Sequence, residues 1–204
     1  SFVETVGLEI DSTPLRITSV AGAFPASQSF IEVKALEVAM AIESGADEID
    51  IVLNPGLMLS GHEAEAASEV ELLREEAKDV VLKVIIESGA LKSPELIRRA
   101  SLVSMFAGAD FIKTSTGKID VAATPEAAFV MCHAIKDYYN LTGRKVGFKA
   151  AGGVKTPDDA ALYYTIVEEV LGEEWLTTDL FRIGASSAAN NLISAIEDKD
   201  IKYF

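Results

Sequence analysis

Residues 110–118 read DFIKTSTGK, and Lys113 interrupts a run that is otherwise typical of a buried β-strand. A second lysine, Lys149, lies in the same way within residues 145–153, which read KVGFKAAGG. An ammonium group that is buried without a partner costs so much free energy that its pKa shifts or a counter-charge accompanies it. A lysine kept neutral near pH 7 is a nucleophile toward carbonyl groups. These two segments therefore predict an enzyme that works through a Schiff base.

Outward from these two segments, β-rich runs alternate with amphipathic segments along the whole chain. The runs are too uniformly apolar for a half-exposed antiparallel sheet, so we expect parallel strands covered by helices. Ser93, Thr124 and Thr156 each precede a proline and mark helix starts, and Ser29 with Glu32 matches a capping box. The predicted strands are residues 15–23, 48–53, 80–87, 111–116, 146–150 and 180–183.

The charged residues within the strands favour a barrel over an open, doubly wound sheet. When alternate residues of each strand face inward, the charges of four strands converge on one interior, which an open sheet does not have. A strand leading into a Gly-x-Gly-x-x-Gly turn, typical of dinucleotide binding, is absent. We therefore predict an α/β fold of the TIM (β/α)8 barrel type. The side chains predicted to face the interior are Glu48, Asp50, Lys83, Lys113 and Lys149.

The length of the chain predicts one domain over residues 1–204, with a single good-sized core. A complete barrel has eight strands and about 250 residues, whereas six strands are predicted here. We therefore expect that the first two strand-helix units are absent from this chain and that its barrel domain is incomplete on the N-terminal side.

The charge balance limits the choice of partners. With 18 basic and 32 acidic residues, the net charge of −14 argues against nucleic acid or an anionic membrane surface. A small phosphorylated substrate stays compatible with this charge, because backbone N–H groups and one or two lysines suffice to bind a phosphate.

The remaining composition fits a cytoplasmic enzyme without a metal. The sequence has no apolar run of about 18 residues, and its single Cys132 fits a reducing compartment. His62 and His133 lie far apart in the sequence, so we expect no metal site and no cofactor.

Five longer motifs follow one another in a fixed order. They are ADEIDIV at 46–52, KVIIESG at 83–89, FIKTSTGK at 111–118, VGFKAAGG at 146–153 and FRIGASS at 181–187. Together they closely resemble the deoxyribose-phosphate aldolases, a class I Schiff-base aldolase family, over essentially the whole chain. Ala150 departs from the family pattern, which often has proline there. The resemblance implies reversible cleavage of 2-deoxy-D-ribose 5-phosphate to acetaldehyde and D-glyceraldehyde 3-phosphate, in deoxyribonucleotide and carbohydrate catabolism.

The resemblance also implies three catalytic positions. Lys113 matches the Schiff-base lysine, whose protonated imine serves as an electron sink. Lys149 matches the second active-site lysine, whose charge lowers the pKa of Lys113, and it is also a candidate ion-pair partner for Asp50. Asp50 matches the family aspartate that relays protons. Lys83 stays outside this set, because an interior salt bridge with Glu48 accounts for it most simply.

Three turns after predicted strands are candidates for binding the substrate phosphate. Their glycines allow close backbone approach, and barrels commonly hold a phosphate after their last two strands. The candidate residues are Gly117, Lys118, Gly152, Gly153, Val154, Lys155, Gly184, Ala185, Ser186 and Ser187.

Three alternatives remain open at this point. The substrate is deoxyribose 5-phosphate or another phosphorylated aldose or ketose. The chain is a working aldolase or a truncated, non-catalytic barrel fragment that binds phosphosugars. It acts alone or as a homo-oligomer, either a dimer or a tetramer.

Overall fold

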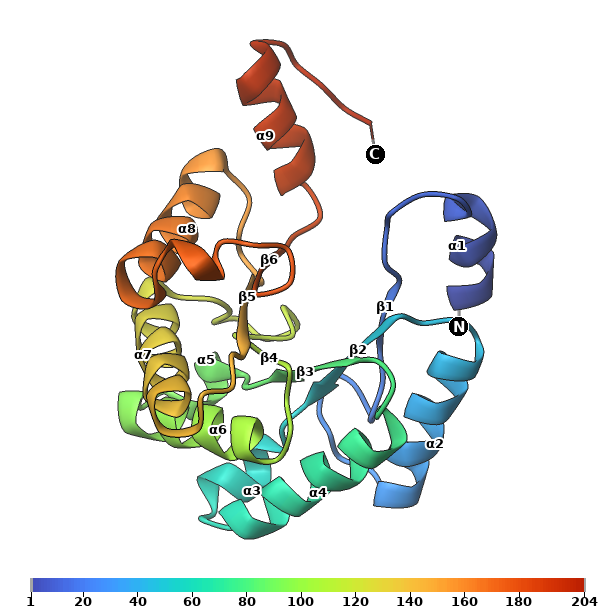
Figure 1. Ribbon diagram of the computed structural model, residues 1–204, viewed down its shortest axis with the longest axis vertical. Coiled ribbons are helices and arrows are strands. Elements are labelled where there is room, and N and C mark those ends of the chain that lie inside the picture. The colour runs from blue at the N-terminus through green and yellow to red at the C-terminus, as the bar shows by residue number, and fades with distance from the viewer. Residues whose placement is uncertain (1, 204) are drawn as a thin grey trace.

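The computed structural model describes residues 2–203 and shows six parallel strands in one sheet, in the order β1-β2-β3-β4-β5-β6 (Figure 1). The strands are β1 (Thr18–Val20), β2 (Glu48–Val52), β3 (Val81–Ile85), β4 (Phe111–Lys113), β5 (Gly147–Ala151) and β6 (Phe181–Gly184). Sequential parallel strands with one helical layer outside them are the arrangement of a (β/α) barrel, so the predicted fold class is confirmed. The sheet forms part of a barrel, with β1 and β6 as its edge strands.

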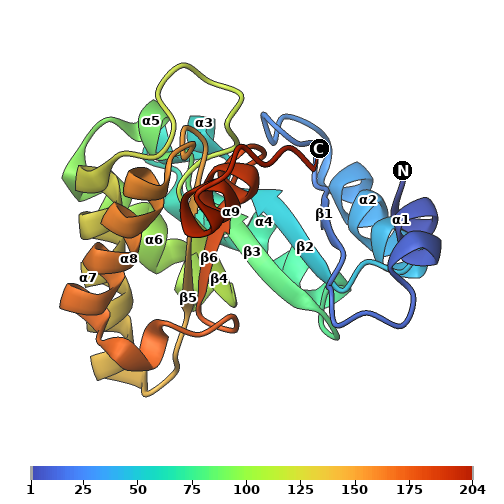
Figure 2. The ribbon, with the colours of Figure 1, turned by 90° about the horizontal axis from the view of Figure 1, so that it is seen from above.

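Helices line the outer, convex side of the sheet (Figure 2). Helices α6, α7 and α8 form one continuous layer, in which α7 packs against both neighbours. The helices are α1 (Val3–Ile10), α2 (Ile31–Glu43), α3 (Pro55–Leu59), α4 (Glu63–Glu76), α5 (Ser88–Leu91), α6 (Pro94–Phe106), α7 (Pro125–Thr142), α8 (Pro157–Leu171) and α9 (Ala188–Glu197), with a 3₁₀ turn η1 (Glu173–Trp175).

The alternation of side chains along each strand separates the apolar core from the charged interior. Ile49 and Ile51 of β2 are fully buried within the apolar core cluster. Asp50 lies between them in sequence, so it points to the opposite, concave face. Lys83 of β3 is the register partner of Asp50, so its side chain points to the same concave face. The predicted inward direction of these charges is therefore confirmed.

Three of the predicted helix starts are confirmed. The side-chain oxygens of Ser93, Thr124 and Thr156 accept hydrogen bonds from the third residue after each of them, as N-caps do. The predicted capping box at Ser29 is wrong. Helix α2 begins at Ile31 and its N-cap is Phe30, which has no side-chain cap, so Ser29 lies one residue too early.

The predicted first strand is longer than the observed one. Only residues 18–20 of the predicted 15–23 form a strand, because β1 is an edge strand that pairs with β2 alone. The chain then turns at Gly22 and Ala23, which both have positive φ angles. The loop that follows is therefore fixed by turn geometry and not by sheet pairing.

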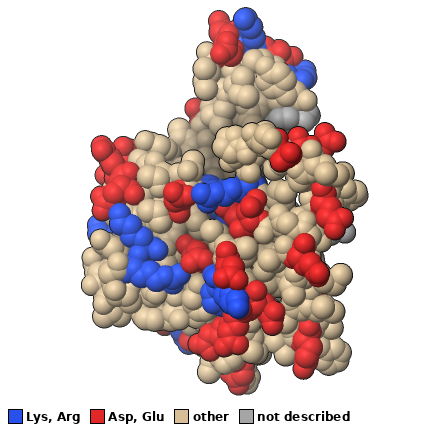
Figure 3. Space-filling model, turned by 45° about the vertical axis from the view of Figure 1, so that its right-hand side comes forward, with Lys and Arg blue, Asp and Glu red and all other residues tan. Residues whose placement is uncertain are grey.

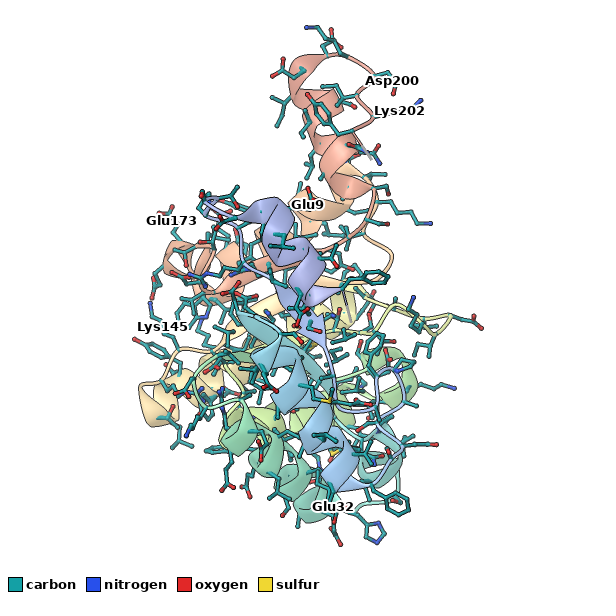
Figure 4. All side chains as sticks on the ribbon, turned by 90° about the vertical axis from the view of Figure 1, so that its right-hand side faces the viewer. Glu9, Glu32, Lys145, Glu173, Asp200 and Lys202 are labelled. Carbon is teal, nitrogen blue, oxygen red and sulfur yellow. The ribbon has the colours of Figure 1, made fainter. Side chains whose placement is uncertain are left out.

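On the face shown in Figure 3, acidic side chains are spread widely, with a few Lys and Arg groups among them. Glu9 on α1 and Glu32 on α2 are exposed examples (Figure 4).

None of the helices between residues 2 and 203 has both the length and the apolar character to cross a bilayer.

Candidate active site

The predicted catalytic residues meet on the concave face of the sheet. Lys113 on β4 and Lys149 on β5 are register partners, so their side chains leave the sheet side by side. Both amines reach the same atom of β2, since each Nζ lies 2.8 Å from Oδ2 of Asp50. Asp50 is 1% exposed and Lys113 is 8% exposed, so this contact is shielded from water. Three residues from three strands therefore form one compact centre.

A second charged layer lies beside this centre. Lys83 Nζ is 2.5 Å from Oε2 of Glu48 and 3.1 Å from Oδ1 of Asp50, so the predicted salt bridge with Glu48 is confirmed. Arg182 of β6 pairs with Oε1 of Glu48 at 3.0 Å, and Arg16 lies 3.5 Å from the same atom. These two arginines link both edges of the sheet to Glu48.

Neither arginine is among the side chains that the sequence predicts to face the interior. Arg182 carried a usable signal, because it is a charged residue in the middle of a predicted strand.

The two acidic groups are held ionised by their neighbours. Burial by itself raises the pKa of Asp50, but the charges of Lys149, Lys113 and Lys83 outweigh burial and lower it to about 2. Burial likewise raises the pKa of Glu48, and Lys83, Thr18 and Arg182 outweigh it and lower the pKa to about 2. Asp50 is therefore a stable counter-charge at neutral pH.

The surroundings of Lys113 lower the pKa of its amine. Burial is the largest cause and lowers the pKa of its amine. Asp50 opposes this by stabilising the ammonium, while the charges of Lys149 and Lys83 lower the pKa further, and the net direction is downward. A lowered pKa leaves more free amine near neutral pH, which is the form that attacks a carbonyl carbon.

The three candidate phosphate turns lie at the carboxyl ends of β4, β5 and β6. Gly117, Gly152 and Gly153 have positive φ angles, which glycine adopts without strain. A Cβ on Gly152 would lie 3.1 Å from the Cα of Gly117, so the first two turns touch. A Cβ on Gly184 would lie 3.2 Å from Lys149 Cε, which places the third turn against Lys149.

The other candidate residues for the phosphate occupy the same end of the sheet. Ala185, Ser186 and Ser187 are exposed and lead into α9, whereas Val154 is buried. Lys118 and Lys155 are exposed, and the backbone oxygen of Lys155 accepts from Asn191 of α9. The arrangement offers backbone N–H groups and two lysines next to the centre. Whether these residues bind phosphate stays a prediction.

Metal-binding residues do not gather in the described part of the chain. Between residues 2 and 203, no group of three or more His, Cys, Asp and Glu side chains is arranged to hold an ion.

A parallel (β/α) sheet whose concave face brings two lysines to one buried aspartate defines a protein of the (β/α)-barrel class with a charged interior. Residues 5–187 match the profile of the DeoC/LacD family of aldolases, and the chain belongs to this family.

Two relatives of this chain are named deoxyribose-phosphate aldolases. The chain is 47% identical over 176 residues to the deoxyribose-phosphate aldolase of Mus musculus. The matched region covers 86% of this chain and 55% of that protein. It is 42% identical over 176 residues to the enzyme of Homo sapiens, with the same coverage of 86% and 55%. The chain thus spans a little over half the length of these curated relatives.

A solved structure supports the fold. The tetrameric deoxyribose phosphate aldolase of Aeropyrum pernix superposes with a TM-score of 0.74 at 28% identity and covers 96% of this chain and 74% of that one.

Proposed function

We propose that this protein is a class I aldolase that cleaves 2-deoxy-D-ribose 5-phosphate to acetaldehyde and D-glyceraldehyde 3-phosphate. The observation that carries the proposal is the pair of lysine amines 2.8 Å from one oxygen of buried Asp50. The family membership and the named relatives support the same activity.

Lys113 is the nucleophile in this proposal. Its amine attacks C1 of the open-chain sugar, and loss of water gives an imine between Nζ and C1. The protonated imine accepts the electron pair of the C2–C3 bond as this bond breaks, while the C3 hydroxyl loses its proton and becomes the aldehyde of glyceraldehyde 3-phosphate. The enamine takes up a proton at C2, and hydrolysis releases acetaldehyde and the free lysine.

Asp50 and Lys149 manage charge and protons around this imine. Asp50 lies within hydrogen-bonding reach of both amines, so it can pass a proton between them or to water held beside them. The charge of Lys149 disfavours a second ammonium at Lys113 and so keeps the nucleophile available. Both roles assigned to Lys149, ion-pair partner and charge neighbour, operate together.

The phosphate would be held by the three turns at the carboxyl ends of β4, β5 and β6. Phosphate suits backbone N–H groups at such turns, and Lys118 and Lys155 add positive charge to an otherwise acidic protein. Another phosphorylated sugar would bind to the same turns through its phosphate. The choice of substrate therefore depends on the portion of the sugar that reacts with Lys113.

Activity measurements on purified protein test this function. We expect release of acetaldehyde from deoxyribose 5-phosphate, coupled to an alcohol dehydrogenase, and its loss in the variant Lys113→Met. The matched variant Lys145→Met, at an exposed lysine, should keep the activity. Faster cleavage of another sugar phosphate would change the substrate, and no cleavage of any by a folded protein would favour the non-catalytic fragment.

We also propose one barrel domain over residues 1–204 and a cytoplasmic homo-oligomer. The six strands form one sheet with one core cluster, which supports the single domain. The apolar residues Phe30, Leu36 and Met40, on helix α2 and at its N-cap, are 58 to 79% exposed, as residues of a subunit interface are in a single chain. The relative from Aeropyrum pernix is described as a tetramer. Light scattering should give a mass above that of one chain, and a monomer would contradict the oligomer.

A further inference from the structure

Glu87 is a buried carboxylate that the proposed chemistry does not use. It lies two residues after the end of β3 and is 3% exposed, with its backbone in the left-handed region at a φ of 52°. It is the N-cap of α5 but makes no side-chain cap to that helix. Its side chain instead bonds to the turn after β4, which belongs to a different strand-helix unit. Burying a carboxylate costs free energy, which the hydrogen bonds of Glu87 to this turn must offset.

The carboxylate holds Thr116 at two points. Oε1 accepts from the backbone N–H of Thr116 at 3.1 Å, and Oε2 accepts from its hydroxyl at 2.5 Å. The Thr116 hydroxyl oxygen in turn accepts from the backbone N–H of Lys118 at 3.1 Å. Because a carboxylate only accepts, the hydroxyl proton of Thr116 must point to Glu87 and its lone pairs are left for Lys118. Glu87 therefore fixes the conformation of the turn from Thr116 to Lys118.

This turn depends on side-chain contacts for its position. Residues 114–124 form neither helix nor strand, and the backbone hydrogen bonds of Thr114 to Lys149 and Ser88 are the last that continue the sheet pattern from β4. Their far end passes close over α5, because a Cβ on Gly89 would lie 1.9 Å from the carbonyl oxygen of Val121. On the other side, the Ala123 N–H donates to the oxygen of Gly152 at 3.2 Å. The segment thus lies between α5 and the candidate phosphate turn of β5.

We propose that Glu87 is a positioning residue for the phosphate end of the substrate, acting through Thr116 on Gly117 and Lys118. This inference rests on the proposed function, since the turn would bind the phosphate of the sugar. Glu87 touches neither the lysines nor Asp50 in the contacts above. Its loss should therefore weaken phosphate binding and leave the imine chemistry intact.

The variant Glu87→Gln, made in the whole protein, tests this role. In neither orientation can the oxygen and nitrogen of the glutamine amide both accept, so the variant cannot accept from the backbone N–H and the hydroxyl of Thr116 as the carboxylate does. We expect KM for deoxyribose 5-phosphate to rise about tenfold, the effect of one charged hydrogen bond, with kcat little changed. Cleavage of unphosphorylated 2-deoxyribose should stay as in the wild type. Thr116→Val should reproduce the KM effect, and Thr116→Ser, which keeps the hydroxyl, should restore a near-normal KM.

Glu126→Gln is the matched control, since it removes the same charge from an exposed residue at the start of α7. Calorimetric titration with inorganic phosphate gives a second readout that needs no aldolase activity. Weaker phosphate binding in Glu87→Gln would support the positioning role even if the wild type cleaved no sugar. The absence of sugar cleavage would contradict only the proposed function. An unchanged KM and phosphate affinity, or equal losses with both sugars, would overturn the positioning role.

Discussion

Asp50 is the residue on which the charged centre depends. One carboxylate faces three lysines, with Lys113 and Lys149 at Oδ2 and Lys83 at Oδ1. Removing one partner from a buried ion cluster leaves uncompensated charge and typically costs about 3–5 kcal/mol. The same residue is therefore expected to matter for both stability and catalysis.

The variant Asp50→Asn separates these two effects. An amide keeps the shape but neither balances the three amines nor relays a proton, so we expect the aldolase kcat to fall about 100-fold or more. Steady-state kinetics and urea unfolding on the same preparation would measure both losses. Asp158→Asn, at an exposed residue of α8, is the control and should be silent. A fully active Asp50→Asn would remove Asp50 from the mechanism.

Lys149 contributes to the lowered pKa of Lys113, after burial as the largest cause. The lowered pKa of Lys113 means that the rate should rise with pH as the ammonium loses its proton, in a range below the usual lysine pKa of 10.5. Lys149→Met removes a charge that disfavours this ammonium, so the pKa rises and the rising limb of the kcat/KM profile should move to higher pH. An unchanged or downward-shifted limb would contradict this account.

At the scale of elements, strand β5 fits against β4 through a single small residue. Gly147 pairs in register with Phe111, and a Cβ on Gly147 would lie 2.3 Å from the ring of Phe111. The ring is 3% exposed and has little room to move. The ring therefore occupies the space that a side chain at position 147 would need, between the two strands that carry Lys113 and Lys149.

Gly147→Ala should therefore destabilise the protein by about 1–3 kcal/mol, the usual cost of overpacking a core. Chemical denaturation would measure the change in the free energy of unfolding. Gly7→Ala is the control, because its Cβ would make an ordinary contact at 3.6 Å and alanine favours the helix α1. Equal stabilities of the two variants would argue against the tight contact.

The sequence predicted the elements where local chemistry decides them and failed where long-range contacts do. Hydroxyl-proline pairs located the starts of α6, α7 and α8, and strand alternation predicted that Lys83 and Glu48 face the same interior, where they form an ion pair. The capping box at Ser29 failed because the chain enters α2 one residue later. The hydrogen bonds from Thr116 to Glu87 were not predicted, since they join residues 29 positions apart in an irregular turn.

At the scale of the whole molecule, the interior charges link stability to pH. Asp50 and Glu48 both have a pKa of about 2, below their ordinary values of 3.8 and 4.5. Groups with a lowered pKa stabilise the folded state above the ordinary value and lose this contribution as the pH falls through the folded value. For Asp50 the difference corresponds to a contribution on the order of 2 kcal/mol.

The free energy of unfolding should therefore decline as the pH falls from about 4.5 to about 2. Urea titrations across this range would measure the decline, and Glu48→Gln should show a shallower slope. If that variant lost stability as steeply as the wild type, Glu48 would not be responsible for the acid sensitivity.

The most direct test of a nucleophilic Lys113 is reduction with borohydride in the presence of acetaldehyde, followed by peptide mass spectrometry. The account predicts an ethyl group on Nζ of Lys113, formed by reduction of its imine, and no label at this position in Lys113→Met. A label on Lys149 instead, or none on a folded protein that cleaves the sugar, would contradict it.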